Sequence, residues 1–268
     1  MPLNREARLA HMQRAVIGID VGGTGIKGAA VEFETGSRIT SRHRVPTPHG
    51  GRPADIVAEV GAMVAAIRAE LAESGHDPAA DAIGVTLPGV VRQGVIHTAA
   101  NIDPSWIGTD AAALLREATG SPCLVVNDAD AAAYAESALG AARGLPGMTM
   151  VLTFGTGIGS GCVYDDALIP NFELGHLQLD GHEDIERYAS AKAIEREGIT
   201  LDEWADRAAR YVRHLELLFH PDRFVLGGSI SKSSDHYLPF DGVTAPVVPA
   251  RFRNNAGIVG AARLANPA

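Results

Sequence analysis

Residues 16–31 read VIGIDVGGTGIKGAAV, and residues 150–164 read MVLTFGTGIGSGCVY. In both stretches an apolar run leads into a Gly-Thr-Gly-Ile turn, at 23–26 and at 155–158, and a second apolar run follows. A unit repeated about half a chain apart indicates two related halves, each with its own glycine hairpin. Two such hairpins can hold a phosphate chain from both sides, which favours a phosphotransferase.

Strand and helix patterns alternate along the rest of the chain, which predicts an α/β architecture. Apolar residues at helical spacing predict a helix from Pro53 to about residue 73. Further helices are expected near 109–119, 129–142, 183–197, 201–219 and in the closing NNAGIVGAARLA, with strands at 82–87, 124–126 and 224–226. Because the pattern restarts near Pro122, we expect a flexible lead at 1–14, a first α/β domain at 15–122, joined by a helix at 255–268, and a second at 123–254.

Composition excludes several classes of protein. The net charge of −9 argues against general nucleic-acid binding, and an aromatic content of 5% leaves few surfaces for stacking bases. No apolar run approaches the ~20 residues that span a bilayer, so we expect no membrane partner. The two cysteines, Cys123 and Cys162, lie in apolar runs, which predicts buried free thiols and a cytoplasmic protein.

The first turn also spells G-x-G-x-x-G, the dinucleotide-binding fingerprint. That fingerprint needs a helix directly after the turn, whereas residues 29–33 predict a return strand. We interpret both turns instead as nests, in which glycine backbone N–H groups converge on an anion. Thr24 and Thr156 add hydroxyls, and Lys27 adds a positive charge. Asp20 is placed to hold Mg²⁺, directly or through water. The alternative is two tight hairpins without a ligand.

Two polar residues, Asn127 and Asp128, follow a buried strand. Asp128 also precedes a predicted helix, whose dipole favours an ionised carboxylate. Such a carboxylate can accept the proton of an alcohol that attacks phosphorus. An aspartate at this place is as readily a helix N-cap, and the local sequence leaves both roles open.

A second polar cluster lies in NFELGHLQ, where Glu173 and His176 can bond the hydroxyls of one small ligand. Together with His182 and Glu183 they do not form H-E-x-x-H, and no cysteine lies nearby, so we expect no zinc site. Asn101 is a further candidate for hydroxyl binding, although such residues before a proline are commonly turn formers.

Taken in order, the motifs of this chain resemble the ROK family. They are DVGGTGIKG at 20–28, the Pro88-Gly89 turn, Asn101 with Trp106, Asn127-Asp128, LTFGTGIGSG at 152–161 and ELGH at 173–176. The family comprises bacterial sugar kinases and sugar-responsive repressors with the actin-like, ribonuclease-H-type fold. The resemblance extends from Ala15 to Ala265 and implies an α/β sugar kinase of two domains with an interdomain cleft.

The resemblance implies a role for each candidate residue. Asp128 would be the catalytic base that deprotonates the sugar hydroxyl. The hexose would be bound by Gly89, Asn101, Asn127, Asp128, Glu173, His176 and Glu186. The phosphoryl donor would be bound, with Mg²⁺ at Asp20, by Asp20, Gly22, Gly23, Thr24, Gly25, Lys27, Thr153, Gly155, Thr156, Gly157, Gly227 and Gly228, and an adenine would lie near 228–231.

The chain departs from the family pattern at two places. Many members follow ELGH with a cysteine-rich zinc site, whereas this chain continues LQLDGHEDIERYAS, so we expect no structural zinc. Only about 14 residues precede the first strand, so we expect no DNA-binding repressor domain.

The segments ELGHLQLDG and RFRNNAGIVGAA resemble most the polyphosphate-dependent glucokinases of the family, and among these the polyphosphate/ATP glucomannokinases. This implies phosphorylation of glucose and mannose at the 6-hydroxyl from polyphosphate, ATP or both. The positive residues to consider for polyphosphate are Lys27, Lys192, Lys232, Arg251 and Arg253, each of which is as readily a solvated surface charge. The alternatives are an ATP-only kinase of another hexose and a non-catalytic sugar sensor; the oligomer can be a monomer or a homodimer.

Overall fold

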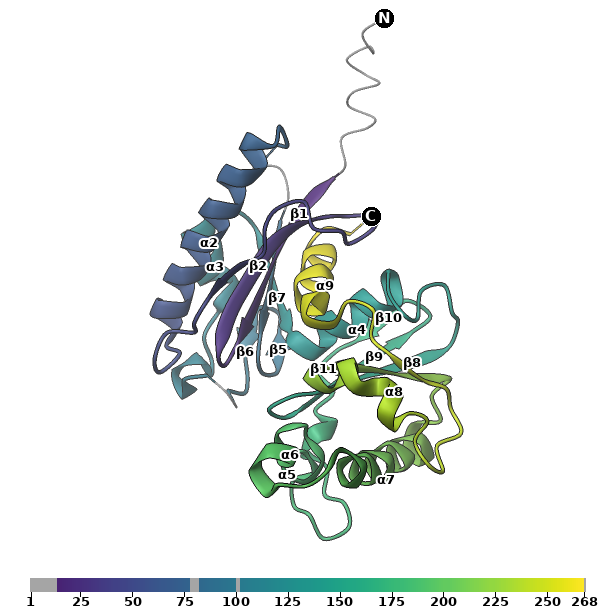
Figure 1. The fold of residues 1–268 in the computed structure, drawn as a ribbon. Coiled ribbons are helices and arrows are strands. Elements are labelled where there is room, and N and C mark those ends of the chain that lie inside the picture. Colours follow the sequence, from purple (N-terminus) through teal and green to yellow (C-terminus); the bar gives the residue numbers. More distant parts are fainter. Residues whose placement is uncertain (1–13, 78–81, 100–101, 268) are drawn as a thin grey trace, which may run out of the picture. The chain divides into compact units, whose positions relative to one another are not determined.

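The computed structural model describes residues 14–77, 82–99 and 102–267, which form two compact units (Figure 1). Unit 1 holds the described residues up to Val126 together with those from Ala261 onward, and unit 2 is Asn127–Gly260. No helix in these ranges is long and apolar enough to cross a membrane.

A five-stranded sheet of order β3-β2-β1-β4-β7 lies at the centre of unit 1. Its strands are β1 (Ala15–Gly22), β2 (Gly25–Glu32), β3 (His43–Val45), β4 (Ile83–Leu87) and β7 (Cys123–Asn127). β1 and β2 form the predicted antiparallel hairpin, β3 pairs antiparallel to β2, and β4 pairs parallel to β1. A small hairpin of β5 (Val91–Arg92) and β6 (Val95–Ile96) follows β4.

Unit 2 repeats this plan in a five-stranded sheet of order β10-β9-β8-β11-β12. Its strands are β8 (Met148–Phe154), β9 (Ile158–Tyr164), β10 (Ala167–Ile169), β11 (Arg223–Gly228) and β12 (Val247–Pro249). β8 and β9 are antiparallel, β10 is antiparallel to β9, and β11 is parallel to β8. The glycine hairpin therefore occupies the same place in both sheets, as the sequence repeat predicts.

Helices cover both faces of the sheet in unit 1. The helix α2 (Pro53–Glu73) buries six apolar residues at helical spacing, and α3 (Ala111–Thr119) lies beside it, with η1 (Pro104–Trp106) before it. Gly28 of β2 lets α2 approach, because a Cβ there would lie 2.7 Å from the sulfur of Met63. On the opposite face a Cβ at Gly84 would overlap the backbone of Ala261, in α9 (Ala256–Ala265).

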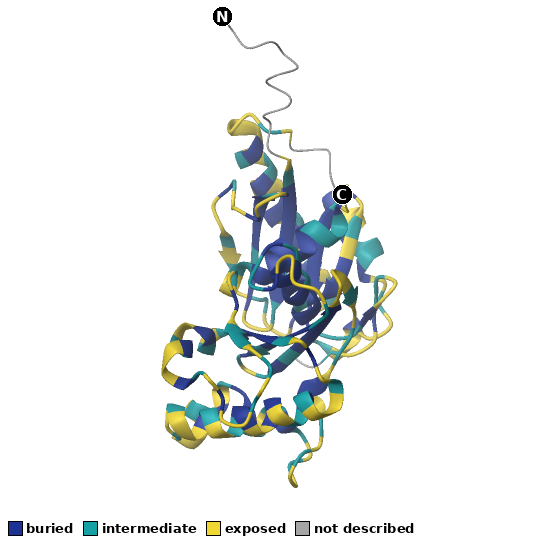
Figure 2. Ribbon diagram, turned by 90° about the vertical axis from the view of Figure 1, so that its right-hand side faces the viewer, coloured by how far each residue is buried: buried dark blue, intermediate teal, exposed yellow. Residues whose placement is uncertain are grey.

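Unit 2 is also layered. The helix α4 (Asp128–Ala138) covers β8 and β9, and it packs close at Gly161, where a Cβ would lie only 2.6 Å from the carbonyl oxygen of Ala129. The aromatic core on the other face includes Trp204, whose ring meets Phe154 edge-on at 5.4 Å. The remaining elements are α5 (Ile185–Ala189), α6 (Lys192–Glu197), α7 (Leu201–Phe219), α8 (Ser234–Tyr237), η2 (Leu174–His176), η3 (Ser229–Ser233) and η4 (Arg253–Asn255). Figure 2 shows the central strands of the sheets buried and the outer faces of the helices exposed.

Three predicted details differ in the structure. α4 ends at Ala138 and not near residue 142. The carboxylate of the fully buried Glu136 accepts a hydrogen bond from the backbone N–H of Ala141, which draws the chain out of the helix. The same carboxylate lies where a Cβ of residue 140 would be, so this position needs glycine. The predicted helix at 183–197 is two short helices, α5 and α6. Cys162 is buried and free as predicted, whereas the free Cys123 is only half-buried.

Candidate functional site

The two Gly-Thr-Gly-Ile turns differ in length although their sequences are identical. In unit 1, Gly22 pairs with Gly25, so two residues connect β1 to β2. In unit 2, Phe154 pairs with Ile158, so three residues connect β8 to β9. The same tetrapeptide therefore presents its backbone N–H groups differently in the two units.

The glycines of these turns do not serve backbone freedom, and only some of them are needed for space. Gly25, Gly155 and Gly157 do not have φ values in the left-handed region, which the nest interpretation had led us to expect. A Cβ at Gly157 would overlap the carboxylate of Glu186, whereas nothing lies within 4 Å of a Cβ at Gly155. At Gly25 a Cβ would lie 3.3 Å from the carbonyl of Val45.

Asp20 lies at the centre of a polar row on one face of the unit 1 sheet. Its two carboxylate oxygens are bonded separately: Oδ1 accepts from the Thr86 hydroxyl at 2.9 Å, and Oδ2 lies 3.3 Å from the Lys27 ammonium. The strand register places these three residues opposite one another on β4, β1 and β2. The structure thus brings together two of the residues predicted to bind the phosphoryl donor.

Gly89 of unit 1, predicted to lie at the sugar, has a φ of +146° that side chains rarely adopt. A Cβ there would also overlap the carbonyl of Thr98, so only glycine fits this turn. The predicted sugar ligand Asn101 lies outside the described residues.

Asn127 and Asp128 open α4, and the Asp128 Oδ1 accepts from the backbone N–H of Ala129 at 2.9 Å. Asn127 is the N-cap: its Oδ1 accepts from the backbone N–H groups of Ala129 at 2.8 Å and of Asp130 at 3.1 Å. The alternative in which Asp128 caps the helix is therefore wrong. Asp128 is the first helical residue and is partly exposed, so its carboxylate gains from the helix dipole and can still reach a ligand.

Three of the predicted sugar ligands of unit 2 are grouped. His176 Nε2 lies 3.9 Å from the Glu173 carboxylate, and Glu186 Oε2 accepts the backbone N–H of Ile158 at 3.1 Å. Partial burial raises the pKa of Glu173; the charge of Glu186 adds to this effect, and His176 opposes it. Through Ile158, Glu186 connects this group to the second glycine turn.

His176 and Glu186 also form a group with Asp184, which sequence reasoning missed. His176 Nδ1 lies 3.5 Å from Asp184 Oδ1, and one ligand atom from each of the three residues lies within 4.8 Å of the others. This spacing can accommodate a metal ion, although exposed acidic groups commonly lie this close without one. No cysteine belongs to the group.

The end of β11 lies beside the second turn. Gly227 pairs with Thr153, and Gly228 pairs with Phe154 of β8. Gly228 has a φ of +83°, and a Cβ there would overlap the Phe154 carbonyl, so this position needs glycine. Ser231, within the stretch expected near an adenine, is buried and donates to the Gly228 carbonyl at 2.8 Å.

Asp130 is a second carboxylate of α4 that the sequence reasoning did not single out. It is only 1% exposed, and its Oδ2 accepts the backbone N–H of Asn171 at 2.8 Å, which ties α4 to the loop that carries Glu173. Burial raises the pKa of Asp130 to about 7, with smaller contributions from the charges of Glu173 and Asp128. An acidic residue among the alanines of a buried helix was the available signal.

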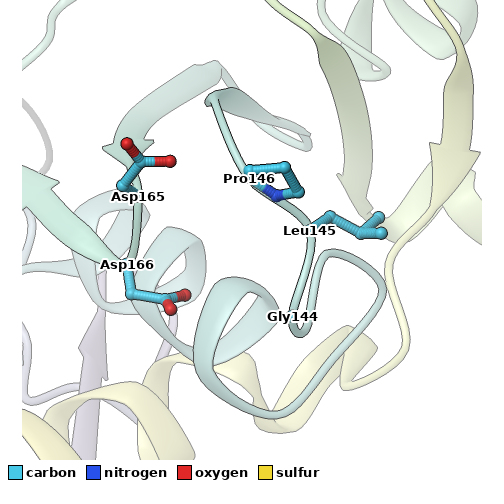
Figure 3. Close-up of a pocket in the computed structure, with 5 residues that line it drawn as sticks. All are labelled: Gly144, Leu145, Pro146, Asp165 and Asp166. Atoms are coloured by element: carbon cyan, nitrogen blue, oxygen red, sulfur yellow. The ribbon is translucent and has the colours of Figure 1, made fainter.

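A small pocket in unit 2 lies apart from these groups in the sequence (Figure 3). It is lined by Gly144, Leu145, Pro146, Asp165 and Asp166, none of which is a predicted site residue. Its two carboxylates lie in the turn between β9 and β10 and bond it to neighbouring segments. Asp165 accepts a hydrogen bond from the N–H of Gly147, and Asp166 accepts one from the hydroxyl of Ser137. We therefore assign it a structural role.

Comparison with known proteins identifies the family. The model of the ROK family matches residues 16–198. The chain belongs to the ROK family. Among ROK relatives, the polyphosphate glucokinase of Mycobacterium tuberculosis is 42% identical over 262 residues, which are 97% of this chain and 95% of the relative.

Solved ROK structures share the fold. The inorganic polyphosphate/ATP-glucomannokinase from Arthrobacter sp. strain KM superimposes with a TM-score of 0.84 at 48% identity, over 92% of this chain and 96% of that chain. A ROK glucokinase from Streptomyces griseus, solved with glucose and AMPPNP, gives a TM-score of 0.73 at 27% identity, over 94% and 99% of the two chains. The predicted actin-like α/β fold of a ROK sugar kinase is confirmed.

Proposed function

We propose that this chain is a kinase that transfers a phosphoryl group from inorganic polyphosphate or ATP to a hexose. The observation that carries the proposal is similarity over almost the whole chain to a polyphosphate glucokinase and to a polyphosphate/ATP-glucomannokinase. The acceptors we propose are glucose and mannose, at the 6-hydroxyl.

Asp128 is the proposed catalytic base. Its carboxylate takes the proton of the sugar hydroxyl as the oxygen forms a bond to phosphorus, while the bond from phosphorus to the remaining phosphate chain breaks. With Asn127 filling the cap position of α4, Asp128 lies in the first turn, at the positive end of the helix dipole, which favours a negative charge there.

The proposed hexose ligands are Glu173, His176 and Glu186, with Gly89, Asn101 and Asn127. Since Asn127 uses its side-chain oxygen to cap α4, a contact with a sugar hydroxyl would come from its amide nitrogen. The carboxylates and the imidazole can accept and donate hydrogen bonds to neighbouring hydroxyls. Such fixed ligands orient the reacting hydroxyl, and orientation supplies much of the rate in phosphoryl transfer.

The proposed phosphoryl-donor ligands are the turns at 22–25 and 155–157 with Asp20, Lys27, Thr153, Gly227 and Gly228. The carboxylate of Asp20 suits Mg²⁺, which prefers oxygen ligands and retains several waters. Because both of its oxygens already have protein partners, contact through water fits best. When bound, Mg²⁺ would neutralise charge on the phosphates.

We further propose that units 1 and 2 are the two domains, with the boundaries after Val126 and before Ala261 in place of the predicted boundaries near Pro122 and residue 255. The free thiols of Cys123 and Cys162 fit a reducing compartment, so we propose the cytoplasm as the location. We expect neither nucleic acid nor membrane among the partners.

A donor-swap assay tests the function. Glucose and mannose are each offered to the wild-type protein with polyphosphate or with ATP as the sole phosphoryl donor, and the sugar phosphate is measured. Transfer from at least one donor is expected. Hexose binding without transfer from either donor would instead favour the sugar sensor.

The role of Asp128 is tested with Asp128→Asn. Removing a general base lowers kcat by roughly 10²–10⁴-fold, and hexose affinity in calorimetry should change little because the amide keeps the size of the side chain. Asp206→Asn, on the exposed face of α7, is the matched control and should retain wild-type kcat. Near wild-type turnover in Asp128→Asn would show that another group takes the proton.

A further inference from the structure

One segment of this acidic chain is strongly basic. Between residues 35 and 54 there is no aspartate or glutamate, whereas the chain as a whole has a net charge of −9. The basic residues of this segment are Arg38, Arg42, His43, Arg44, His49 and Arg52. A local concentration of one sign of charge in a protein of the other sign indicates a binding surface for an anion.

The segment includes β3, which extends the polar row of the unit 1 sheet. Arg44 of β3 pairs with Lys27 of β2, and Lys27 pairs with Asp20 of β1. Residues opposite one another on neighbouring strands project from the same face. Arg44 therefore projects from the face that carries Asp20 and Lys27, which we propose as ligands of the phosphoryl donor.

The guanidinium of Arg44 lies beside the first glycine turn. A Cβ built on Gly25 would be 3.5 Å from Nε of Arg44 and 3.9 Å from its Nη2. The chain after β3 is also tied to this turn, since the Thr47 hydroxyl donates to the Gly22 carbonyl at 2.5 Å. The basic segment therefore lies against the turn and is bonded to it through Thr47.

Arg44 is exposed, and its guanidinium forms no ion pair within the residues that the structure describes. Its neighbours differ: Lys27 faces Asp20, and His43 lies 3.1 Å from the Glu70 carboxylate. Of the cations considered from the sequence alone, Lys192 pairs with Glu195, and Arg251 donates to the Leu139 carbonyl. No partner of this kind holds the Arg44 guanidinium in the part of the chain that the structure describes.

We propose that Arg44, together with Arg42, binds the part of a polyphosphate chain that extends beyond the reacting phosphates. Arg42 stands two residues before Arg44, so in an extended chain it projects from the same face. Guanidinium groups bind phosphate oxygens through two parallel hydrogen bonds. The proposal rests on the proposed function, because it assumes that the first turn holds the phosphoryl donor.

The proposal distinguishes the two phosphoryl donors. A long polyphosphate continues as a chain of anionic groups past the turn, where ATP continues as an uncharged nucleoside. Arg42 and Arg44 should therefore favour long polyphosphate over both ATP and tripolyphosphate. A row of cations also makes binding depend on salt concentration, because dissolved ions screen the attraction between exposed charges.

The test compares Arg44→Gln and the double variant Arg42→Gln/Arg44→Gln with the wild type. KM is measured for long-chain polyphosphate, tripolyphosphate and ATP. We expect KM for long-chain polyphosphate to rise about tenfold for each guanidinium that is removed, and KM for ATP to move less than about twofold. Arg116→Gln, an exposed arginine of α3 in the same unit, is the matched control and should leave all three values as in the wild type.

Binding of long-chain polyphosphate, followed by calorimetry, is measured alongside turnover. If the wild type binds polyphosphate but transfers phosphoryl groups from neither donor, the proposed function fails. The proposed polyphosphate site at Arg42 and Arg44 is then still tested, because the double variant should lose polyphosphate binding. Wild-type protein that does not bind polyphosphate, or an equal rise in KM for ATP and long polyphosphate, would overturn the proposal. An unchanged KM in the double variant would do the same.

Discussion

Replacing the buried Asp130 by asparagine should remove a loss of stability that the wild type suffers as pH rises. The free energy of unfolding of unit 2 in Asp130→Asn, compared with that of the wild type, should therefore be higher at alkaline pH than at acid pH. Asp130 is 1% exposed, one of its oxygens accepts from Asn171, and the other is buried without a hydrogen-bond partner among the described residues. Asparagine keeps the size of the side chain and the acceptor for Asn171, but it cannot ionise.

The magnitude follows from the pKa of Asp130, which burial raises from 3.8 to about 7. Between these values the folded protein binds one more proton than the unfolded chain, so the free energy of unfolding falls as pH rises. The slope is about 1.4 kcal/mol per pH unit. From pH 5 to pH 8 the wild type should therefore lose about 3 kcal/mol that Asp130→Asn retains. Asp128 and Glu173 are the charged neighbours whose fields act on Asp130, and both are present in the two proteins.

The assay uses the tryptophans, of which the chain has two. Trp106 lies in unit 1 and Trp204 in unit 2, and both are fully buried. In a Trp106→Phe background, fluorescence reports the unfolding of the unit that contains Asp130. Guanidinium unfolding is measured at pH 5 and pH 8 for the wild-type side chain and for Asp130→Asn, with Asp206→Asn as the exposed control.

A stability difference that is the same at both pH values would mean that Asp130 does not change its protonation between them, and would contradict the prediction. A difference that grows with pH in the Asp206→Asn control as well would point to the overall charge and not to the buried carboxylate.

Two further changes test the site and the fold. Gly157→Ala places a Cβ against the Glu186 carboxylate, so hexose affinity in calorimetry should fall about tenfold. Gly155→Ala, whose Cβ meets open space, is the control and should bind hexose as the wild type does. Equal losses of affinity in the two variants would argue against a role for Glu186. Thr200→Ala removes the capping box of α7 and should lower the free energy of unfolding by about 1 kcal/mol in the Trp204 signal, and a change below about 0.3 kcal/mol would show that packing alone fixes this helix end.

The sequence predicted those parts of the fold that depend on local pattern. The apolar spacing of α2, which begins at Pro53 and stops before Gly75, predicted this helix, and the duplicated glycine hairpin predicted two related halves, which the matching strand orders of the two sheets fit. The break between α5 and α6, by contrast, was not predicted: Ser190 ends α5 with an extended backbone, and both short helices pack against α7, a contact between segments that no local pattern encodes.

The site residues were recognisable one by one, but their connections were not. Contacts such as Ile158 to Glu186, Asn171 to Asp130, and Gly25 to Arg44 join residues that are remote in the sequence. They depend on strand register and loop path, which no local pattern encodes. The different lengths of the two identical turns arise in the same way, from the pairing of the flanking strands.

β3 is the outermost strand of the unit 1 sheet, and one of its edges has no neighbouring strand among the described residues. Such an edge offers backbone N–H and C=O groups to any other extended chain, and natural proteins guard it with basic side chains and proline. Arg42 precedes this strand, Arg44 lies within it and Pro46 follows it, so the residues proposed to bind a polyanion also keep two molecules from joining edge to edge. Substituting both arginines should therefore raise the tendency of the protein to aggregate, and a bound phosphate polymer, by covering the same edge, should protect it.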